Sequence, residues 1–151
     1  MVRVEEAIEA TPEVVAAVQR LVPQLSSSAS VPTEADIADI VASPATVLLL
    51  ARDDEAGGEI VGTLTLALFR IPTGLRAWIE DVVTAESARG RGVGTALTHE
   101  ALRRAGEAGA RTVDLTSRAS REDANRLYQR LGFERRDTNV YRAQVSRPID
   151  R

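Results

Sequence analysis

Hydrophobic and polar positions along the chain follow two periods, one typical of strands and one typical of helices. Side chains that alternate every second residue indicate a half-buried strand, whereas apolar residues spaced three and four apart indicate a helix. Apolar and β-branched runs predict strands over residues 2–7, 46–53, 60–70, 75–84, 112–116, 133–137 and 140–145. Helical spacing predicts helices over residues 12–23, 34–42, 95–108 and 124–131.

Capping residues support the boundaries of the predicted helices. Residues typical of N-caps precede the first, second and last helices, at Thr11, Thr33 and Ser120. The Ser120 cap is followed three residues later by an acid, so it resembles a capping box. Glycines typical of C′ positions follow the last two helices, at Gly109 and Gly132.

The order of these elements predicts a single domain built on a mixed sheet. Strand–helix–strand units occur only in the second half of the chain. We therefore expect an α/β fold of the α+β type, with a mostly antiparallel central sheet of six to seven strands flanked by about four helices. The 151 residues, 44% of them hydrophobic, are enough for one domain over residues 1–151 with one core.

The composition excludes several kinds of metal site, nucleophile and binding partner. The chain has no cysteine and a single histidine, His99, which excludes cysteine-based zinc sites, thiolate nucleophiles and multi-histidine metal sites. We expect no metal, and we expect His99 to be solvated on the polar side of its helix. A net charge of -3 gives no general attraction to nucleic acid or to an anionic membrane, so we expect neither as a partner. The N-terminal segment lacks a signal-peptide pattern and no apolar run could span a bilayer, so we expect a cytoplasmic protein.

Residues 79–95 carry the most informative pattern, because a strand runs into a glycine-rich loop and the loop runs into a helix. The loop holds Gly90, Gly92 and Gly94 together with Arg89 and Arg91. Unpaired N–H groups at the start of the helix and the positive end of its dipole converge there, which favours a phosphate or pyrophosphate. Glycine allows the backbone to approach such an anion closely.

Two other phosphate-binding loops do not fit this segment. A P-loop needs Gly-Lys-Ser/Thr at its end, and the chain contains no lysine. The dinucleotide-binding fingerprint needs a third glycine at the position where Thr95 stands. These mismatches argue against nucleoside triphosphate hydrolysis and dinucleotide binding.

Three segments together resemble the GCN5-related N-acetyltransferases (GNATs). They are the strand I-E-D-V-V at residues 79–83, the spacing Arg89-x-x-Gly92-x-Gly94, and A-N-R-L-Y-Q-R-L-G-F at residues 124–133. They follow in the family's order and on the family's kinds of element, over a cofactor-binding core of about residues 75–142. The resemblance implies a GNAT-like fold, acetyl-CoA as cosubstrate and an acyl-CoA N-acyltransferase activity.

The same resemblance implies roles for individual residues. The backbone of Val82, Val83 and Thr84 would bind the pantetheine arm, and Asn125 would contact it. The pyrophosphate would lie on the loop formed by Arg89, Gly90, Arg91, Gly92, Val93, Gly94 and Thr95. Tyr128 would lie near the thioester sulfur. Asn125 and Tyr128 are three residues apart on a helix and so share one face, which allows a single cofactor to meet both.

We expect transfer of the acetyl group from acetyl-CoA to a primary amine of a small molecule or peptide, by direct attack. Glu80, beside the cofactor strand, is the candidate base, acting through water because a carboxylate is a weak base toward an ammonium group. Asp81 is its rival. Tyr128 is the candidate general acid, because the pKa of a phenol is close to that of the thiol it would protonate. The alternative for Tyr128 is an aromatic ring that packs into the core.

Regular alternation along the strand predicts that the two acids face opposite ways. Glu80 would share one face with Trp78 and Val82, and Asp81 would lie on the other face with Val83. Two other functions fit the same motifs: a non-catalytic acyl-CoA sensor or regulatory module, and a transferase of a longer acyl group. The acceptor has no shared motif, because specificity in such folds lies in loops. A homodimer is also open, since dimers are frequent among soluble proteins.

Overall fold

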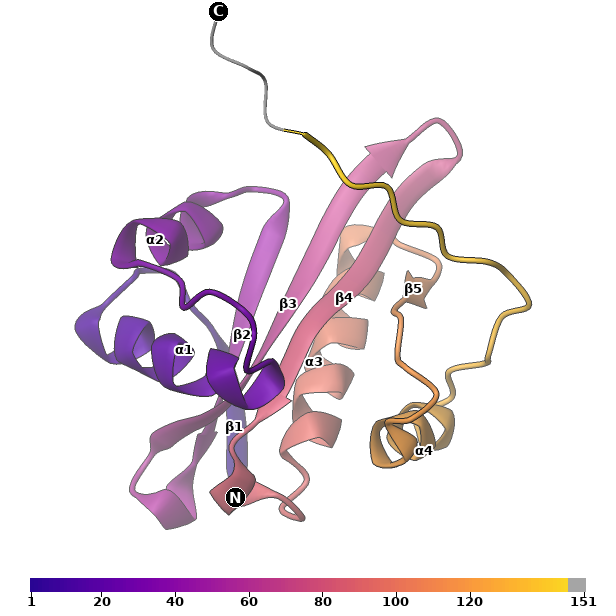
Figure 1. Cartoon of the computed structure of the whole chain (residues 1–151). Coiled ribbons are helices and arrows are strands. Elements are labelled where there is room, and N and C mark those ends of the chain that lie inside the picture. Colours follow the sequence, from indigo (N-terminus) through magenta and orange to yellow (C-terminus); the bar gives the residue numbers. More distant parts are fainter. Residues whose placement is uncertain (147–151) are drawn as a thin grey trace, which may run out of the picture.

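One sheet organises the chain, and its strands follow one another in sequence order (Figure 1). The structure, a computed structural model, describes residues 1–146. Four strands pair antiparallel: β1 (Val2–Glu6), β2 (Thr46–Asp53), β3 (Glu59–Ile71) and β4 (Gly74–Thr84). The short β5 (Val113–Asp114) pairs parallel with β4 and forms the edge of the sheet.

Helices cover both faces of the sheet. α1 (Pro12–Leu25) contacts β3 and β4, α2 (Glu34–Ala42) contacts β2, and α3 (Val93–Ala108) contacts β1 to β4. In Figure 1, α1 and α2 lie in front of the strands and α3 lies behind them, so they occupy opposite faces. α4 (Glu122–Arg130) follows β5, and 3-10 turns at Asp54–Ala56 and Glu86–Ala88 follow β2 and β4. None of the helices in residues 1–146 is both long and apolar enough to cross a membrane.

The core forms between the sheet and the helices. Leu64 and Leu66 of β3 and Leu97 of α3 are completely buried. Burying such a side chain stabilises a fold by about 1.5–3 kcal/mol. Gly62 allows α3 to approach the sheet, because a Cβ at this position would lie 2.6 Å from Val93 Cγ1 and 3.2 Å from Leu97 Cδ1.

Local sequence signals predicted several boundaries correctly. β2 and α2 have the predicted bounds, and Thr33 and Asp36 form a capping box at the start of α2. The Thr11 hydroxyl accepts a backbone N–H in the first turn of α1, and Gly109 closes α3 in the left-handed conformation. α1 continues two residues past Pro23, so the proline removes one backbone hydrogen bond from the last turn without ending the helix at that residue.

The prediction of two final strands is wrong, and within residues 1–146 the sheet has five strands rather than six to seven. Residues 133–137 and 140–145 lie in irregular chain. The strand predicted at residues 112–116 is reduced to the two residues of β5, which leaves little backbone for a further strand to pair with. Val140, Tyr141 and Val145 of the final segment are 75%, 88% and 91% exposed. Residues 147–151 lie outside the described residues.

The predicted cap of α4 is also wrong. Ser120 lies one residue too early, because Arg121 occupies the N-cap position, and no side chain among the described residues caps this helix. Glu122 and Asp123 place two acids in the first turn, where a negative charge interacts favourably with the helix dipole. Gly132 follows the end of the helix with a φ of 93°, as its predicted role requires.

Candidate active site

A cleft opens where β4 and β5 part. The two strands pair only at Ala77 with Val113 and at Trp78 with Asp114. β4 continues to Thr84, whereas the chain after β5 leaves the sheet and leads to α4. The cleft has a volume of about 710 Å³ and is lined by the ends of α1 and β4, the loop before α3, and α4.

The loop before α3 makes the start of that helix one wall of the cleft. Gly90 and Gly92 have φ values of 82° and 78°, a left-handed conformation that glycine adopts without strain. The helical ladder starts with a bond from Ala96 N–H to the Gly92 carbonyl, and no side chain in the described part of the chain caps the helix. The N–H groups of the first turn are therefore available to an anion in the cleft.

Most of the residues predicted to bind the cofactor line this cleft. From β4 and the loop they are Val82, Val83, Thr84, Arg89, Gly90, Gly92, Val93, Gly94 and Thr95. Because this wall combines an uncapped helix start with one arginine, it is suited to an anionic group such as a pyrophosphate.

Arg91 points away from the cleft. Its guanidinium pairs with the buried carboxylate of Asp53 at the end of β2 and lies 3.6 Å from the Glu55 carboxylate. The hydrogen bond from Arg91 holds the pKa of Asp53 below its ordinary value, although burial of the carboxylate opposes this effect. Arg91 therefore anchors the loop to β2, and Arg89 is the arginine of this loop that lines the cleft.

Tyr128 of α4 forms the opposite wall. The residue is 8% exposed, lines the cleft and packs edge-on against Phe133 with ring centroids 5.6 Å apart. Burial raises the pKa of the phenol above its ordinary value, and Arg121 offsets part of the rise. The phenol is therefore protonated at neutral pH and able to donate a proton.

Asn125 shares the helix with Tyr128 but has different contacts. Its amide nitrogen donates to the carbonyls of Arg118 and Arg121, both at 2.8 Å. Asn125 is not among the described residues that line the cleft. It ties the loop after β5 to the start of α4 and so holds this wall of the cleft in position.

The family of the chain follows from comparison with known proteins. The model of the acetyltransferase (GNAT) family matches residues 15–133. The chain belongs to the GNAT family. This membership supports an acyltransferase activity, for which GNATs typically use acetyl-CoA. No curated protein sequence matches this GNAT chain.

Solved structures share the GNAT fold over almost the whole chain. A protein of Agrobacterium tumefaciens str. C58 described as an acetyltransferase has 26% identity and a TM-score of 0.82, over 94% of this chain and 99% of that one. A transcriptional regulator of Bacillus halodurans C-125 has 28% identity and a TM-score of 0.76, over 95% and 100%. Glucosamine-6-phosphate N-acetyltransferase of Arabidopsis thaliana, at 18% identity and a TM-score of 0.77 over 95% and 98%, shares the fold alone.

β4 of this GNAT chain contains a bulge next to the cleft. Thr63 of β3 pairs with Val83, and Thr65 pairs with Glu80. Two residues of β4, Asp81 and Val82, therefore lie opposite one residue of β3, Leu64. Asp81 in the bulge has a φ of 50°, a left-handed conformation that aspartate tolerates better than most residues other than glycine. A bulge leaves backbone groups outside the regular ladder.

The bulge corrects the predicted directions of the side chains in β4. Residues directly opposite each other on paired strands share a face, and Thr63 and Thr65 share one because they are two apart. Glu80 and Val83 therefore lie on the same face, whereas regular alternation predicted opposite faces. Glu80 shares a face with Trp78, as predicted, because their partners Thr65 and Ala67 are two residues apart. The Trp78 indole N–H also donates to Glu80 Oε1 at 2.7 Å.

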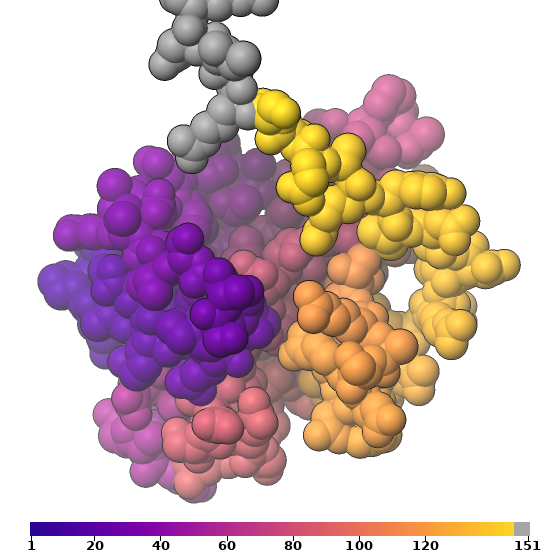
Figure 2. Space-filling view, viewed as in Figure 1, coloured from indigo at the N-terminus to yellow at the C-terminus, as the bar shows by residue number. Residues whose placement is uncertain are grey.

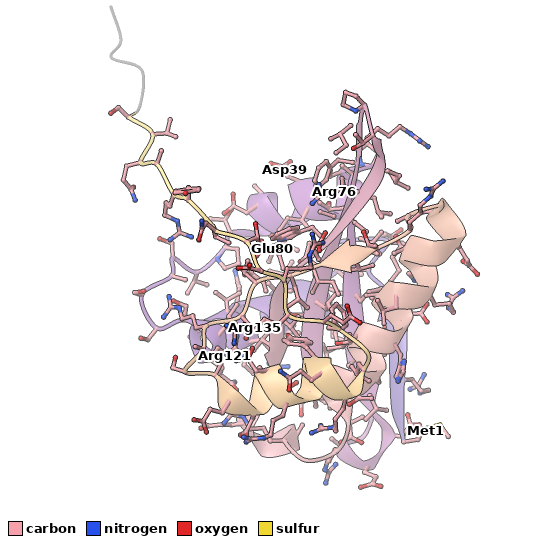
Figure 3. All side chains as sticks on the ribbon, turned by 90° about the vertical axis from the view of Figure 1, so that its right-hand side faces the viewer. Met1, Asp39, Arg76, Glu80, Arg121 and Arg135 are labelled. Atoms are coloured by element: carbon pink, nitrogen blue, oxygen red, sulfur yellow. The ribbon has the colours of Figure 1, made fainter. Side chains whose placement is uncertain are left out.

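Glu80 itself lies outside the cleft lining. Its side chain is exposed, and the described residues that form the cleft wall do not include it. Figure 3 shows Glu80 on the side of the molecule that carries α4 and the final segment. The structure therefore brings Tyr128 and the loop of residues 89–95 to one cleft, and it leaves Glu80 outside the lining of that cleft.

The cleft also includes residues that the sequence analysis missed. Gln24 and Leu25 at the end of α1 line it, and the Gln24 amide oxygen accepts the backbone N–H of Glu86 at 2.9 Å. This bond fixes the end of α1 to the turn that precedes the loop of residues 89–95. No local motif marks Gln24, because its role depends on contact with a segment 62 residues away.

Charged side chains of both signs surround the opening of the cleft. Arg121 and Arg130 line it together with Glu122 and Asp123 of α4. In Figure 2 a furrow separates the indigo atoms of α1 from the orange atoms of α4. Residues 1–146 contain no group of three or more His, Cys, Asp or Glu side chains that could hold a metal ion, and His99 is exposed as predicted.

Proposed function

We propose that the protein is an N-acetyltransferase that transfers the acetyl group of acetyl-CoA to a primary amine of a small molecule or peptide. The observation that carries this proposal is the composition of one cleft, which unites the uncapped start of α3, the bulged strand β4 and the buried phenol of Tyr128. Its volume of about 710 Å³ lies within the range of roughly 300–1,000 Å³ that is typical of small-molecule and cofactor sites.

In this proposal the pyrophosphate of acetyl-CoA binds the loop of residues 89–95. The N–H groups of the first turn of α3 donate to phosphate oxygens, and Arg89 adds a positive charge. Arg91 supports the loop from behind through its pair with Asp53. The pantetheine arm lies along Val82, Val83 and Thr84, and Asn125 supports the opposite wall.

The transfer step needs a neutral amine, a polarised carbonyl and a proton for the sulfur that leaves. The amine nitrogen attacks the thioester carbonyl carbon, a C–N bond forms and the C–S bond breaks. Backbone N–H groups near Val83 polarise the carbonyl oxygen. Tyr128 gives its phenolic proton to the thiolate, and Glu80 accepts a proton from the amine through water.

A small-molecule acceptor has support from the fold relatives. The Arabidopsis enzyme is named for glucosamine-6-phosphate, which carries a primary amine. The cleft of the present chain is lined by side chains of several elements. We therefore propose small amines as the first class to test and peptide N-termini as the second.

A thiol-release assay tests the proposed function with little background, because the chain contains no cysteine. Purified protein and acetyl-CoA are incubated with single amines: amino acids, amino sugars, aminoglycosides, polyamines, arylalkylamines and a peptide with a free N-terminus. Released coenzyme A is measured with a thiol reagent, and the acetylated product is verified by its mass. We expect amine-dependent release with at least one class.

The same assay decides between the alternatives. Binding of acetyl-CoA without amine-dependent release in any class would contradict the proposed function and favour an acyl-CoA sensor. Substituting longer acyl-CoA thioesters, with the best amine held constant, tests acyl-chain preference. Faster release from a longer thioester than from acetyl-CoA would replace acetyl transfer by transfer of that acyl group.

A further inference from the structure

Trp78 and Glu80 form a pair on β4 outside the cofactor cleft. The indole Nε1–H donates to Glu80 Oε1 at 2.7 Å, while Trp78 is half-buried and Glu80 is exposed. Within residues 1–146 Glu80 forms no ion pair. The indole therefore occupies one carboxylate oxygen and leaves the other, Oε2, accessible to a ligand.

The pair lies on the face of the sheet opposite α3. Trp78 pairs with Ala67 of β3 and Glu80 pairs with Thr65. Gly62, which packs against α3, lies five residues before Ala67 and three before Thr65. Because both separations are odd, Gly62 lies on the opposite face of the sheet from these two residues. Trp78 and Glu80 consequently share the face that α1 and α2 cover farther along the sheet (Figure 1).

Two neighbours on this face favour a cation that carries an apolar body. Arg76 pairs with Asp114 at 3.4 Å, so the positive charge nearest along β4 is already matched. Phe69, which pairs with Arg76 across the strands, is 44% exposed and adds a second aromatic side chain to the Trp78 face. Figure 3 shows Arg76 and Glu80 along the same side of the molecule.

We propose that Trp78 is a positioning residue for Glu80 and that the two form the binding site for the ammonium group of the acceptor. The indole hydrogen bond holds the carboxylate in one orientation, and the second oxygen receives the ammonium group or the water that relays its proton. The acceptor class is a primary amine on an apolar or aromatic body, because the Trp78 and Phe69 rings offer apolar surface and attract cations. This inference rests on the proposed function for its chemical step but not for its binding step.

The binding step has its own readout, because Trp78 is the only tryptophan of the chain and therefore the only source of indole emission. The protein without acetyl-CoA is titrated with 2-phenylethylamine, with 2-phenylethanol, which lacks the ammonium group, and with ethylamine, which lacks the aromatic body. We expect a saturable change in emission with 2-phenylethylamine, none with the alcohol, and about tenfold weaker binding of ethylamine. The Glu80→Gln variant should bind 2-phenylethylamine about tenfold more weakly.

Three results of the titration would overturn the site. They are no saturable change with 2-phenylethylamine, equal binding of the alcohol, and equal binding by Glu80→Gln. Equal binding of ethylamine and 2-phenylethylamine would overturn the aromatic acceptor class. Far-ultraviolet circular dichroism of each variant confirms that the fold is retained.

The positioning role is tested by a double-mutant cycle with the best amine of the turnover screen. Trp78→Phe keeps an aromatic ring and removes the indole donor, so we expect kcat to fall about tenfold with the KM for acetyl-CoA unchanged. In the Glu80→Gln background the same change should have no further effect. An equal loss in both backgrounds would show that Trp78 acts independently of Glu80 and would overturn the role.

Failure of this inference is distinct from failure of the proposed function. If amines are acetylated but Glu80→Gln binds and reacts normally, the Trp78–Glu80 site is wrong and the enzyme stands. If no amine is acetylated, the proposed function is wrong, and the emission titration still decides whether the pair binds an ammonium group.

Discussion

At the scale of single residues, Tyr128 combines burial with a place in the cleft wall. Tyr128→Phe removes the proton donor and keeps the ring that packs against Phe133. We expect kcat to fall about 100-fold or more, the lower end of general acid effects, with the affinity for coenzyme A unchanged. Steady-state kinetics and a coenzyme A titration measure the two quantities separately.

The pH dependence provides a control for this role. Because burial raises the pKa of Tyr128 above the ordinary value of about 10, its protonated form persists throughout the neutral and mildly alkaline range. Loss of the donor should therefore lower kcat by a similar factor at every pH between about 7 and 9. Normal turnover of Tyr128→Phe would assign the residue to packing.

The candidate site residues could be identified from the sequence better than the directions of their side chains could. Gly90 and Gly92 could be selected from the sequence because glycine lets the backbone approach an anion closely, and Tyr128 because its segment resembles one of the GNAT family. The face of Val83 relative to Glu80 could not be predicted, because it depends on a bulge created by the register between β3 and β4. Register is a property of two strands, so alternation within one strand misses it.

At the scale of elements, the loop of residues 89–95, the proposed phosphate-binding loop, is joined to β2 through Arg91 and Asp53. Asp53→Asn and Arg91→Ala should each raise the dissociation constant for coenzyme A about three- to tenfold and leave kcat unchanged, because the loop loses its anchor but no reacting group. The double variant should be no weaker than either single variant, since the two residues act as one unit.

Isothermal calorimetry at neutral pH checks these affinities. Arg91 holds the pKa of Asp53 below its ordinary value of about 3.9, so the ion pair is complete at neutral pH and is lost only as the pH falls below that value. Additive losses in the double variant, or an unchanged dissociation constant in either single variant, would show that the pair does not position the loop.

The packing of α3 against the sheet gives a second prediction at this scale. Gly62→Ala places a Cβ within 2.6 Å of Val93 Cγ1, so α3 has to shift, and we expect a loss of about 1–3 kcal/mol in unfolding free energy. Gly106→Ala in the last turns of α3 meets no atom within 4 Å. It should stabilise the protein by about 0.5–1 kcal/mol, because alanine favours helix.

Urea unfolding of both alanine variants measures these free energies. Equal stability of the two variants would contradict the close contact between Gly62 and α3. Because α3 starts at Val93 beside the cleft, Gly62→Ala should also weaken coenzyme A binding, whereas Gly106→Ala should not.

At the scale of the whole molecule, the elements that could be predicted correctly are those whose ends are determined by residues close together in the sequence. α2 could be bounded because Thr33 and Asp36 cap it, and β2 because an apolar run ends at Asp53. The final strands were predicted from short apolar and β-branched runs, but a strand also needs a partner, and β5 is too short to provide one. The contact of Gln24 with Glu86 could not be predicted either, because only the fold brings α1 to the turn before the loop of residues 89–95.

The central claim is that the cleft between β4 and α4 binds coenzyme A at the start of α3. The most direct measurement is a calorimetric titration of coenzyme A into the protein and into Gly92→Val. Gly92 has a φ of 78°, which valine adopts only with strain, and it lines the cleft. Gly109→Val is the matched control, because Gly109 has a φ of 100° at the far end of α3.

We predict one binding site in the wild-type chain, a dissociation constant raised about tenfold or more by Gly92→Val, and little change in affinity for Gly109→Val. No binding by the wild-type chain, or equal affinity of the wild-type and Gly92→Val proteins, would contradict the account.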